Sequence, residues 1–260
     1  MKKLIALLLA LVMVMALAAC GGETEKTDGE TEETTTVPQE TTEETEEQTT
    51  TEDTTEDVVT VMTFEEFMAA EAESQVVVEC AVQGHQSWWD NKITVYAADE
   101  NGGYFLYELA CSEEDAAKLT DGTWIRVTGV KAVWEGQVEI MEATFEFIEK
   151  EAYVAEVIDV TELLGTEELE AKMTLPVLFK GMTVEAIEFK NGEPGDDIYV
   201  TVKYNDVSYD FCVELYLTGP DTEVYTTVSG LEAGDVVDIE GFLYWYQGPN
   251  THITAVIVVE

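Results

Sequence analysis

One segment of the chain occurs twice, and this repeat constrains the fold more than any other feature of the sequence. Leu119–Ile140 (LTDGTWIRVTGVKAVWEGQVEI) matches Leu231–Ile253 (LEAGDVVDIEGFLYWYQGPNTHI), with one extra residue near Pro249 in the second copy. Apolar and polar residues alternate at the start of both copies, a pattern typical of a strand with one buried face. The repeat therefore predicts two copies of one supersecondary unit, each containing a pair of strands.

Glycines and aromatic residues hold the same positions in both copies. Gly129 and Gly241 lie inside the first strand of each pair, and aromatic-X-Gly turns follow at Trp134 and Tyr246. A glycine in the interior of a strand indicates a sharp bend, such as the corner of a small barrel. Each copy is therefore expected to supply two bent strands of a barrel.

The segments before each copy complete a common plan. Before the first we expect a helix after Thr63, strands over Val76–His85, Lys92–Ala98 and Tyr104–Cys111, and a short helix after Ser112. Before the second we expect a helix over Thr161–Lys172 interrupted at Gly165, strands over Val177–Phe189, Ile198–Tyr204 and Ser208–Leu217, and a weak helix over Tyr225–Leu231. Three strands, a helix and two strands follow one another as in the OB-fold, a five-stranded Greek-key barrel. The predicted fold class is mainly β, with two tandem OB-fold-like five-stranded β-barrels and short helices.

The composition divides the chain into four segments: a leader over 1–19, a linker over 20–60, and barrels over 61–150 and 151–260. In the leader, Lys2 and Lys3 precede an apolar run, and Leu17-Ala18-Ala19-Cys20 is similar to the lipobox of bacterial lipoprotein signal peptides. This similarity implies cleavage before Cys20 and a lipid on its sulfur. An uncleaved membrane helix is the alternative, although the apolar run is shorter than the usual ~20 residues.

Residues 21–57 of the linker consist largely of Thr and Glu and contain almost no apolar residue apart from Val37. Such a segment cannot bury enough surface to offset the entropy of ordering, so we expect a disordered spacer. A functional acidic tail that captures cations is the alternative.

The chain is strongly acidic, with a formal net charge of −43 from 12 Lys and Arg against 55 Asp and Glu. An acidic surface repels the phosphate backbone, so the charge predicts that nucleic acid is an unlikely partner. Neutral or cationic ligands fit this surface better.

The first predicted barrel carries a family resemblance. The stretch QSWWDNKITVYAADENGGYFLYELACSEED, followed by KLTDGTWIRVTGVKAVWEGQVEI, resembles OB-fold domains of Gram-positive surface lipoproteins. It also resembles, more loosely, the OB-fold domains of secreted bacterial nucleases, which share the Leu-x-x-Gly…Gly…aromatic-x-Gly pattern. The resemblance covers residues 62–148 well and 152–260 weakly, and no catalytic unit of such a nuclease is visible. It therefore implies a fold and a location on the extracellular face of the cell membrane, without an activity.

OB-folds usually bind ligands on the face of strands 2 and 3 and in the 1–2 and 4–5 loops. In the first barrel these places hold His85 and the residues predicted to bind a ligand: Trp88, Trp89, Asp90, Asn91, Tyr104, Tyr107 and Trp134. Aromatic planes beside Asp and Asn side chains suit a sugar ring. The alternative is a structural role, in which one of the adjacent tryptophans plugs the barrel end and the other covers its rim. The aromatics of residues 244–250 are interpreted as an interface between the barrels, with a second subsite as the alternative.

The remaining reactive residues match no catalytic or metal-binding motif. Cys80, Cys111 and Cys212 are expected to be buried free thiols, with a Cys80–Cys111 bridge as the alternative, and His85 and His252 fit no metal-ligand spacing. No cofactor, metal or enzyme activity is therefore predicted. The sequence predicts a monomeric, lipid-anchored extracellular binding module whose ligand is a glycan or cell-wall fragment. The alternative is an interaction protein that binds another envelope protein.

Overall fold

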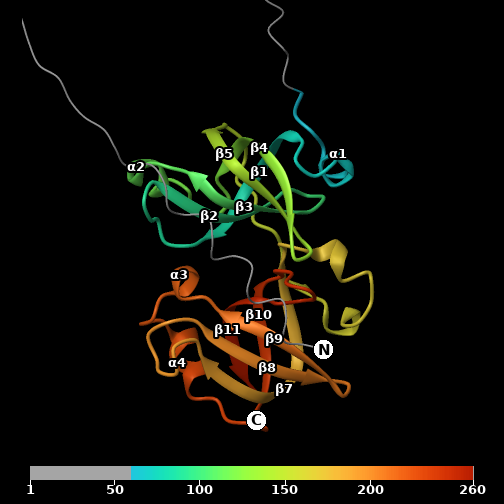
Figure 1. Cartoon of the computed structure of the whole chain (residues 1–260), viewed down its shortest axis with the longest axis vertical. Helices are drawn as coiled ribbons and strands as arrows, with labels where there is room; N and C mark the ends of the chain where they lie inside the picture. The colour runs from blue at the N-terminus through green and yellow to red at the C-terminus, as the bar shows by residue number, and fades with distance from the viewer. Residues whose placement is uncertain (1–59, 260) are drawn as a thin grey trace, which may run out of the picture. The chain divides into compact units, whose positions relative to one another are not determined.

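In the computed structural model, which describes residues 60–259, the strands of the first half close into a five-stranded barrel (Figure 1). They are β1 (Gln75–His85), β2 (Lys92–Ala98), β3 (Gly103–Ala110), β4 (Trp124–Trp134) and β5 (Gln137–Phe147). The hydrogen-bonded order is β1-β2-β3-β5-β4, closed by β4 on β1, and only the β3–β5 pair is parallel. This Greek-key order confirms the predicted OB-fold barrel. Two short helices accompany it, α1 (Phe64–Ala69) and α2 (Glu113–Ala116).

The second half forms a ring-like sheet with the same strand order. Its ring strands are β7 (Pro176–Phe189), β8 (Ile198–Tyr204), β9 (Val207–Val213), β10 (Val236–Phe242) and β11 (His252–Val258). Pairing of β10 with β7 closes the ring, and β11 is parallel to β9 as β5 is to β3. Helix α4 (Glu223–Ser229) lies between β9 and β10 in the chain, and a sixth strand, β6 (Ile158–Asp159), runs parallel to β7.

Two segments of the second half differ from the sequence prediction. The expected helix over Thr161–Lys172 is two 3-10 turns, η1 (Thr161–Leu163) and η2 (Glu170–Lys172), separated by Gly165 at a φ of 79°. The strand expected to run to Leu217 ends at Val213, and a one-turn helix, α3 (Leu215–Thr218), follows it. The amide of Leu215 donates to Asp197 Oδ1 at 2.9 Å, which fixes the start of this turn on the loop before β8.

Equivalent residues of the repeat make equivalent backbone contacts. Gly122 N donates to Val82 O at 2.8 Å, and Gly234 N donates to Val184 O at 2.9 Å. Both glycines have positive φ, 83° and 101°, which side chains other than glycine adopt at a cost. The internal repeat is therefore a structural repeat.

The glycines inside the strands allow close approach between neighbouring strands. A Cβ on Gly129 would lie 2.6 Å from Ile140 Cγ2, and a Cβ on Gly241 would lie 2.3 Å from the carbonyl oxygen of His252. The pairing register shifts beside each glycine, as at a β-bulge. This confirms that the strands bend at these two positions.

Each barrel has its own core, and the predicted alternation is confirmed in both. Ile125 and Val127 of β4 are fully buried in the first core, and Val237 and Ile239 of β10 occupy the second. The helix expected after Thr63 is present as α1 and opens with a capping box, in which Glu66 N donates to Thr63 Oγ1 at 3.2 Å and Thr63 N donates to Glu66 Oε2 at 2.8 Å. The described residues therefore derive their stability chiefly from two apolar interiors.

The predicted leader over 1–19, lipidated Cys20 and almost all of the linker over 20–60 lie outside the described residues. Within residues 60–259, no helix is both long and apolar enough to cross a bilayer.

Candidate binding site

The predicted binding face of the first barrel is covered by the second half of the chain. Tyr96 of β2 and Phe105 of β3 point away from the first core and form a separate apolar cluster with Phe242. The rings of Tyr96 and Phe242 stack at a centroid distance of 4.4 Å and an interplanar angle of 10°. Tyr244 meets Phe105 edge-on at 5.3 Å. The face of strands 2 and 3 is therefore used for packing between the two halves.

The 4–5 loops of the two repeats also pack on each other, as predicted for the aromatics of residues 244–250. Gln247 N donates to Glu135 O at 2.7 Å, and its side-chain amide donates to the Glu135 carboxylate at 2.8 Å. Trp245 N donates to the buried Gln137 side chain at 3.0 Å. Glu135 and Gln247 are equivalent positions of the repeat, so the loops meet through matching residues.

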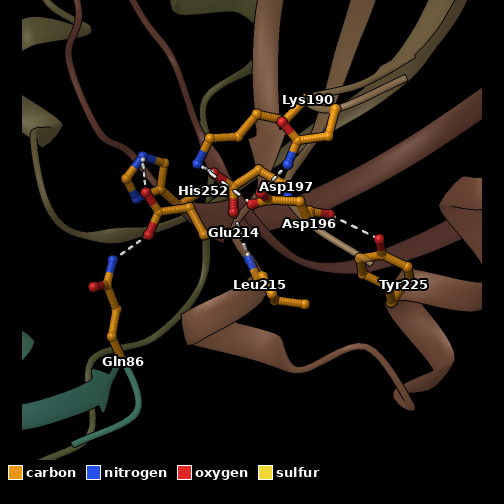
Figure 2. A network of polar contacts seen from close by, with 9 residues as sticks. Gln86, Lys190, Asp196, Asp197, Glu214, Leu215, Tyr225 and His252 are labelled. Carbon is orange, nitrogen blue, oxygen red and sulfur yellow. Dashed lines mark hydrogen bonds and ion pairs between the residues drawn. The ribbon is translucent and has the colours of Figure 1, made fainter. Parts of the chain in front are cut away.

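A buried polar network joins the two halves beside this apolar cluster (Figure 2). The side-chain amide of Gln86 donates to Glu214. The hydroxyl of Tyr96 bonds to His252 Nδ1. A hydroxyl that donates to Nδ1 of a neutral imidazole leaves the proton on Nε2, which faces Glu214 Oε1 at 3.6 Å. Gln86 and Tyr96 belong to the first half, and Glu214 and His252 to the second. The network therefore fixes the register between them.

Burial sets the protonation of this network. Desolvation raises the pKa of Glu214 to about 7, and the negative charge of Asp197 acts in the same direction. Desolvation lowers the pKa of His252 to about 3. As the pH falls, the carboxyl group therefore takes up a proton before the imidazole does.

The same network continues into the loop before β8 (Figure 2). Lys190 Nζ lies 2.8 Å from Asp197 Oδ2 and 3.4 Å from Asp196 Oδ1. The hydroxyl of Tyr225 donates to the backbone oxygen of Asp196 at 2.7 Å. These contacts hold Asp197 in place beside Glu214.

Two reactive groups in and beside the network, the Tyr96 phenol and the Cys212 thiol, are closed to a substrate. The phenol of Tyr96 is fully buried and stacked on Phe242, and Cys212, which pairs with His252 across β9 and β11, is buried as a free thiol. Desolvation raises the pKa of this thiol well above its ordinary range, so the unreactive thiol form is favoured. The geometry therefore supports a structural role for the network.

A groove with a volume of about 580 Å³ opens next to the apolar cluster. The first half contributes His85 and Asp121, and the second contributes residues from α3, α4, β10 and β11. Phe242, Leu217 and Val224 provide its apolar lining, and the hydroxyls of Thr218, Thr222 and Thr254 add polar lining.

Several polar groups of the groove are available to a ligand. Among the described residues, the carboxylates of Asp121 and Glu223 make no hydrogen bond or ion pair, and neither does the hydroxyl of Thr254. His85 uses Nδ1 against the backbone oxygen of Gln86 at 2.8 Å, which leaves Nε2. The carboxylate acceptors and the Thr254 hydroxyl lie beside apolar side chains, and such a combination can bind a polyhydroxylated molecule.

The β1–β2 loop carries the predicted tryptophans, and they point in different directions. Trp88 packs against the first core and donates from Nε1 to the backbone oxygen of Cys111 at 2.8 Å, so it plugs the barrel end as the alternative interpretation states. Trp89 is 74% exposed and does not cover the rim. Asp90 and Asn91 have φ values of 47° and 60° and form the two-residue turn between Trp89 and Lys92.

The other predicted aromatics are divided between the core and the surface. Tyr104 is only 1% exposed, and its hydroxyl donates to Asp99 Oδ2 at 3.0 Å. Its ring is unavailable for stacking on a ligand, and the prediction for Tyr104 is corrected. Tyr107 is 38% exposed and Trp134 is 58% exposed. The structure thus leaves Trp89, Tyr107 and Trp134 as surface rings.

Glu214, Phe242 and the groove were not predicted from the sequence. One signal was present: β2 reads KITVYAA, and every residue after Lys92 is buried. A strand that is apolar on both faces is covered on both faces. The outward Tyr96 was therefore a sign of the packing against the second half.

The expected state of the cysteines is confirmed. Cys80, Cys111 and Cys212 are all free and buried. No group of three or more His, Cys, Asp or Glu within residues 60–259 is arranged to hold a metal ion.

No protein-family model matches the chain, and no curated protein matches it. Solved structures are similar to it at low identity. A murine DNA-binding protein solved with double-stranded DNA is 12% identical, with 71% of this chain and 96% of that chain covered and a TM-score of 0.35. A replication protein A heterotrimer bound to single-stranded DNA is 10% identical, with coverages of 77% and 52% and a TM-score of 0.34. An aspartyl-tRNA synthetase from Entamoeba histolytica is 16% identical with a TM-score of 0.32, and the match covers 38% of this chain and 23% of the synthetase.

These structures overturn the prediction that nucleic acid is an unlikely partner. Two of the three hold DNA, whereas the prediction rested on the net charge of the whole chain. Net charge describes long-range repulsion of phosphate and does not describe what one local surface stacks on or bonds to. Nucleic acid is therefore included among the ligands to be tested.

Proposed function

We propose that this protein is a non-catalytic binding module for a neutral glycan or cell-wall fragment, held outside the cell by a lipid on Cys20. The groove beside the two packed barrels is the proposed site. The observation that carries the proposal is the pairing of its apolar lining, centred on Phe242, with carboxylates of Asp121 and Glu223 that lack a partner among the described residues.

The chemistry of the groove favours a sugar over a more apolar ligand. A sugar places C–H bonds against an apolar floor and donates hydroxyl hydrogens to acceptors such as carboxylates. Hydrogen bonds to charged groups contribute about 1.5–3 kcal/mol each. Two such acceptors and His85 Nε2 therefore provide directional contacts to a polyhydroxylated ring.

The exposed tryptophan of the β1–β2 loop extends this surface. Ser87 N donates to Tyr216 O at 2.6 Å, which ties the loop to α3, and α3 supplies Leu217 and Thr218 to the groove. Trp89 and Tyr216 are both exposed on the two tied segments. They are the aromatic residues proposed to contact a longer glycan beyond the groove.

The anchoring part of the proposal rests on the sequence of the leader. Lys2, Lys3, the apolar run and Leu17-Ala18-Ala19-Cys20 support export and lipidation. Mass spectrometry of the protein from membranes of its cells tests this, with a diacylglyceryl group on an N-terminal Cys20 as the expected result. An unmodified chain beginning at Met1 refutes it.

Calorimetric titration tests the binding function. We expect saturable binding of neutral cell-wall oligosaccharides, and Asp121→Asn or Glu223→Gln alone should each weaken it by about ten- to a hundredfold, since each acceptor contributes about 1.5–3 kcal/mol. The matched control is Glu188→Gln, an equal change of charge on β7 at an exposed side chain outside the groove.

Other ligand classes serve as competing outcomes. The same variants are titrated with single- and double-stranded DNA at low salt and tested for capture of envelope proteins. Binding of DNA or a protein with no response to any oligosaccharide would refute the glycan proposal.

A further inference from the structure

One buried carboxyl group has no partner in the described part of the chain. Glu139 on β5 is only 5% exposed, and within residues 60–259 it makes no hydrogen bond or ion pair. Its neighbour Ile140 belongs to the first core, so the Glu139 side chain leaves the opposite face of the strand. Burial raises the pKa of Glu139. A buried acid without a partner is costly to keep ionised, so its place in the structure needs a reason.

Aromatic residues lie next to Glu139 on the same face of the sheet. Phe105 of β3 is the register partner of Glu139. The Phe105 ring lies 6.5 Å from that of Tyr107 and 5.3 Å from that of Tyr244. Burial raises the pKa of both tyrosines, and the charge of Glu139 acts in the same direction on their hydroxyls, in Tyr107 after the charge of Glu108.

The carboxyl group remains in contact with solvent. Among the described residues, Thr251 Oγ1 is the one side-chain oxygen or nitrogen that is fully enclosed and has no hydrogen-bond partner. The oxygens of Glu139 also lack a partner, so they would belong to the same group if they were fully enclosed. They are therefore partly open to solvent. Tyr107 lies two residues after Phe105 on the same face of β3 and is 38% exposed at the edge of the cluster. Tyr107 is therefore the ring of the cluster that a ligand from solvent would meet first.

Within the described residues, no cationic side chain pairs with Glu139. Lys92, which lies across from β3, pairs with Glu108 at 2.7 Å. Lys131 Nζ is held by the backbone oxygens of Phe67, Met68 and Ala70. Three rings and an uncompensated carboxylate are the elements that recognise an organic cation.

We infer that Glu139, with Phe105, Tyr107 and Tyr244, binds an alkylammonium group. The carboxylate supplies the counter-charge, and the ring faces attract the cation by their quadrupoles. The group can come from a small free amine or from a lysine side chain, since both present an ammonium on an alkyl stem. This site is separate from the groove that contains Asp121 and Glu223.

Calorimetric titration of the purified protein with n-butylammonium chloride tests the inference, with n-butanol as the ligand control that lacks the charge. We expect saturable binding of the cation and none of the alcohol. Glu139→Gln, which keeps the shape of the side chain, should weaken binding at least tenfold. Tyr107→Ser, at a surface ring, should weaken it about two- to thirtyfold, from a cation–π contribution of about 0.5–2 kcal/mol.

Glu142→Gln is the matched control. It removes the same charge from the same strand at an exposed residue and should leave the affinity unchanged within twofold. Thermal unfolding of each variant verifies that it is folded. Asp121→Asn should bind butylammonium as the wild type does, which separates this site from the groove.

A peptide with one central lysine identifies the source of the ammonium. Tighter binding of the peptide than of butylammonium, lost in Glu139→Gln, assigns the site to a protein partner. Binding of the free amine alone assigns it to a small ligand. Equal affinity of wild type and Glu139→Gln, or no saturable binding of either cation, would overturn the inference.

Discussion

Replacing Glu214 by glutamine should change how the stability of the protein depends on pH. Glu214 is 24% exposed, accepts a hydrogen bond from Gln86 and faces His252. Glutamine keeps the size of the side chain and an acceptor for Gln86, and it removes the ionisation. The comparison with wild type therefore isolates one titration.

The magnitude follows from the shift of the pKa of Glu214 from 4.5 to about 7 on burial. Because the folded pKa is raised, the stabilisation from this group is complete below pH 4.5 and is lost as the pH rises through 7. One pKa unit corresponds to about 1.4 kcal/mol, so the total is about 3 kcal/mol. Glu214→Gln should therefore gain about 3 kcal/mol relative to wild type between pH 4.5 and 7.5.

His252 makes the stability of the protein depend on pH in the opposite direction. Its pKa is lowered from 6.5 to about 3, so its stabilisation is present above pH 6.5 and is lost as the pH falls toward 3. In wild type the contributions of Glu214 and His252 cancel between pH 4.5 and 6.5. In Glu214→Gln only the pH dependence caused by His252 remains. The contribution of His252 to the free energy of unfolding of the variant should therefore decrease as the pH falls.

Urea unfolding followed by circular dichroism at half-unit steps from pH 4.5 to 7.5 measures the free energy of unfolding of both proteins. Because carboxylates other than Glu214 titrate in both proteins, their contributions cancel in the difference. A difference that is constant across this range, or that decreases as the pH rises, would refute the assignment of a raised pKa to Glu214.

Two further predictions concern the barrel strands and the β1–β2 loop. Gly241→Ala should destabilise the protein by more than about 1 kcal/mol, because the new Cβ would lie 2.3 Å from the His252 carbonyl oxygen. Gly230→Ala should be nearly neutral, because the nearest atom to the new Cβ is 3.6 Å away. Thermal unfolding of the two variants measures the difference. Acrylamide quenching of fluorescence should fall in Trp89→Phe and change little in Trp88→Phe, since Trp89 is exposed and Trp88 packs against the first core. Equal effects would contradict the placement of the two rings.

The repeat allowed much of the fold to be predicted, because its signals are local. Gly129 and Gly241 indicated strand bends through their missing side chains, and both allow contacts that no larger residue permits. The alternation of Ile125 and Val127 with polar neighbours fixed the buried face of β4. Such features depend on a few adjacent residues, which a single sequence displays.

The candidate site was less predictable because it depends on contacts across more than a hundred residues. In the sequence, Tyr96 looks like any other residue of a buried strand. The structure shows that Phe242 stacks on it and that His252 bonds to it. Tyr104 and Tyr107 were both expected on the ligand-binding face, whereas Tyr104 lies in the core and Tyr107, three residues further along β3, lies on the opposite face. The packing of the second half has no strong local signature, although the apolar character of both faces of β2 indicated it.

The most direct measurement of the central claim is a two-dimensional NMR titration of the labelled protein with a neutral cell-wall oligosaccharide. The proposal predicts saturable shifts of the backbone amides of Gly84, Asp121, Thr218 and Phe242, which line the groove. The amides of Gly192 and Gly195, in the loop before β8, should stay unchanged. Shifts confined to residues outside the groove, or no shifts at saturating oligosaccharide, would contradict the account.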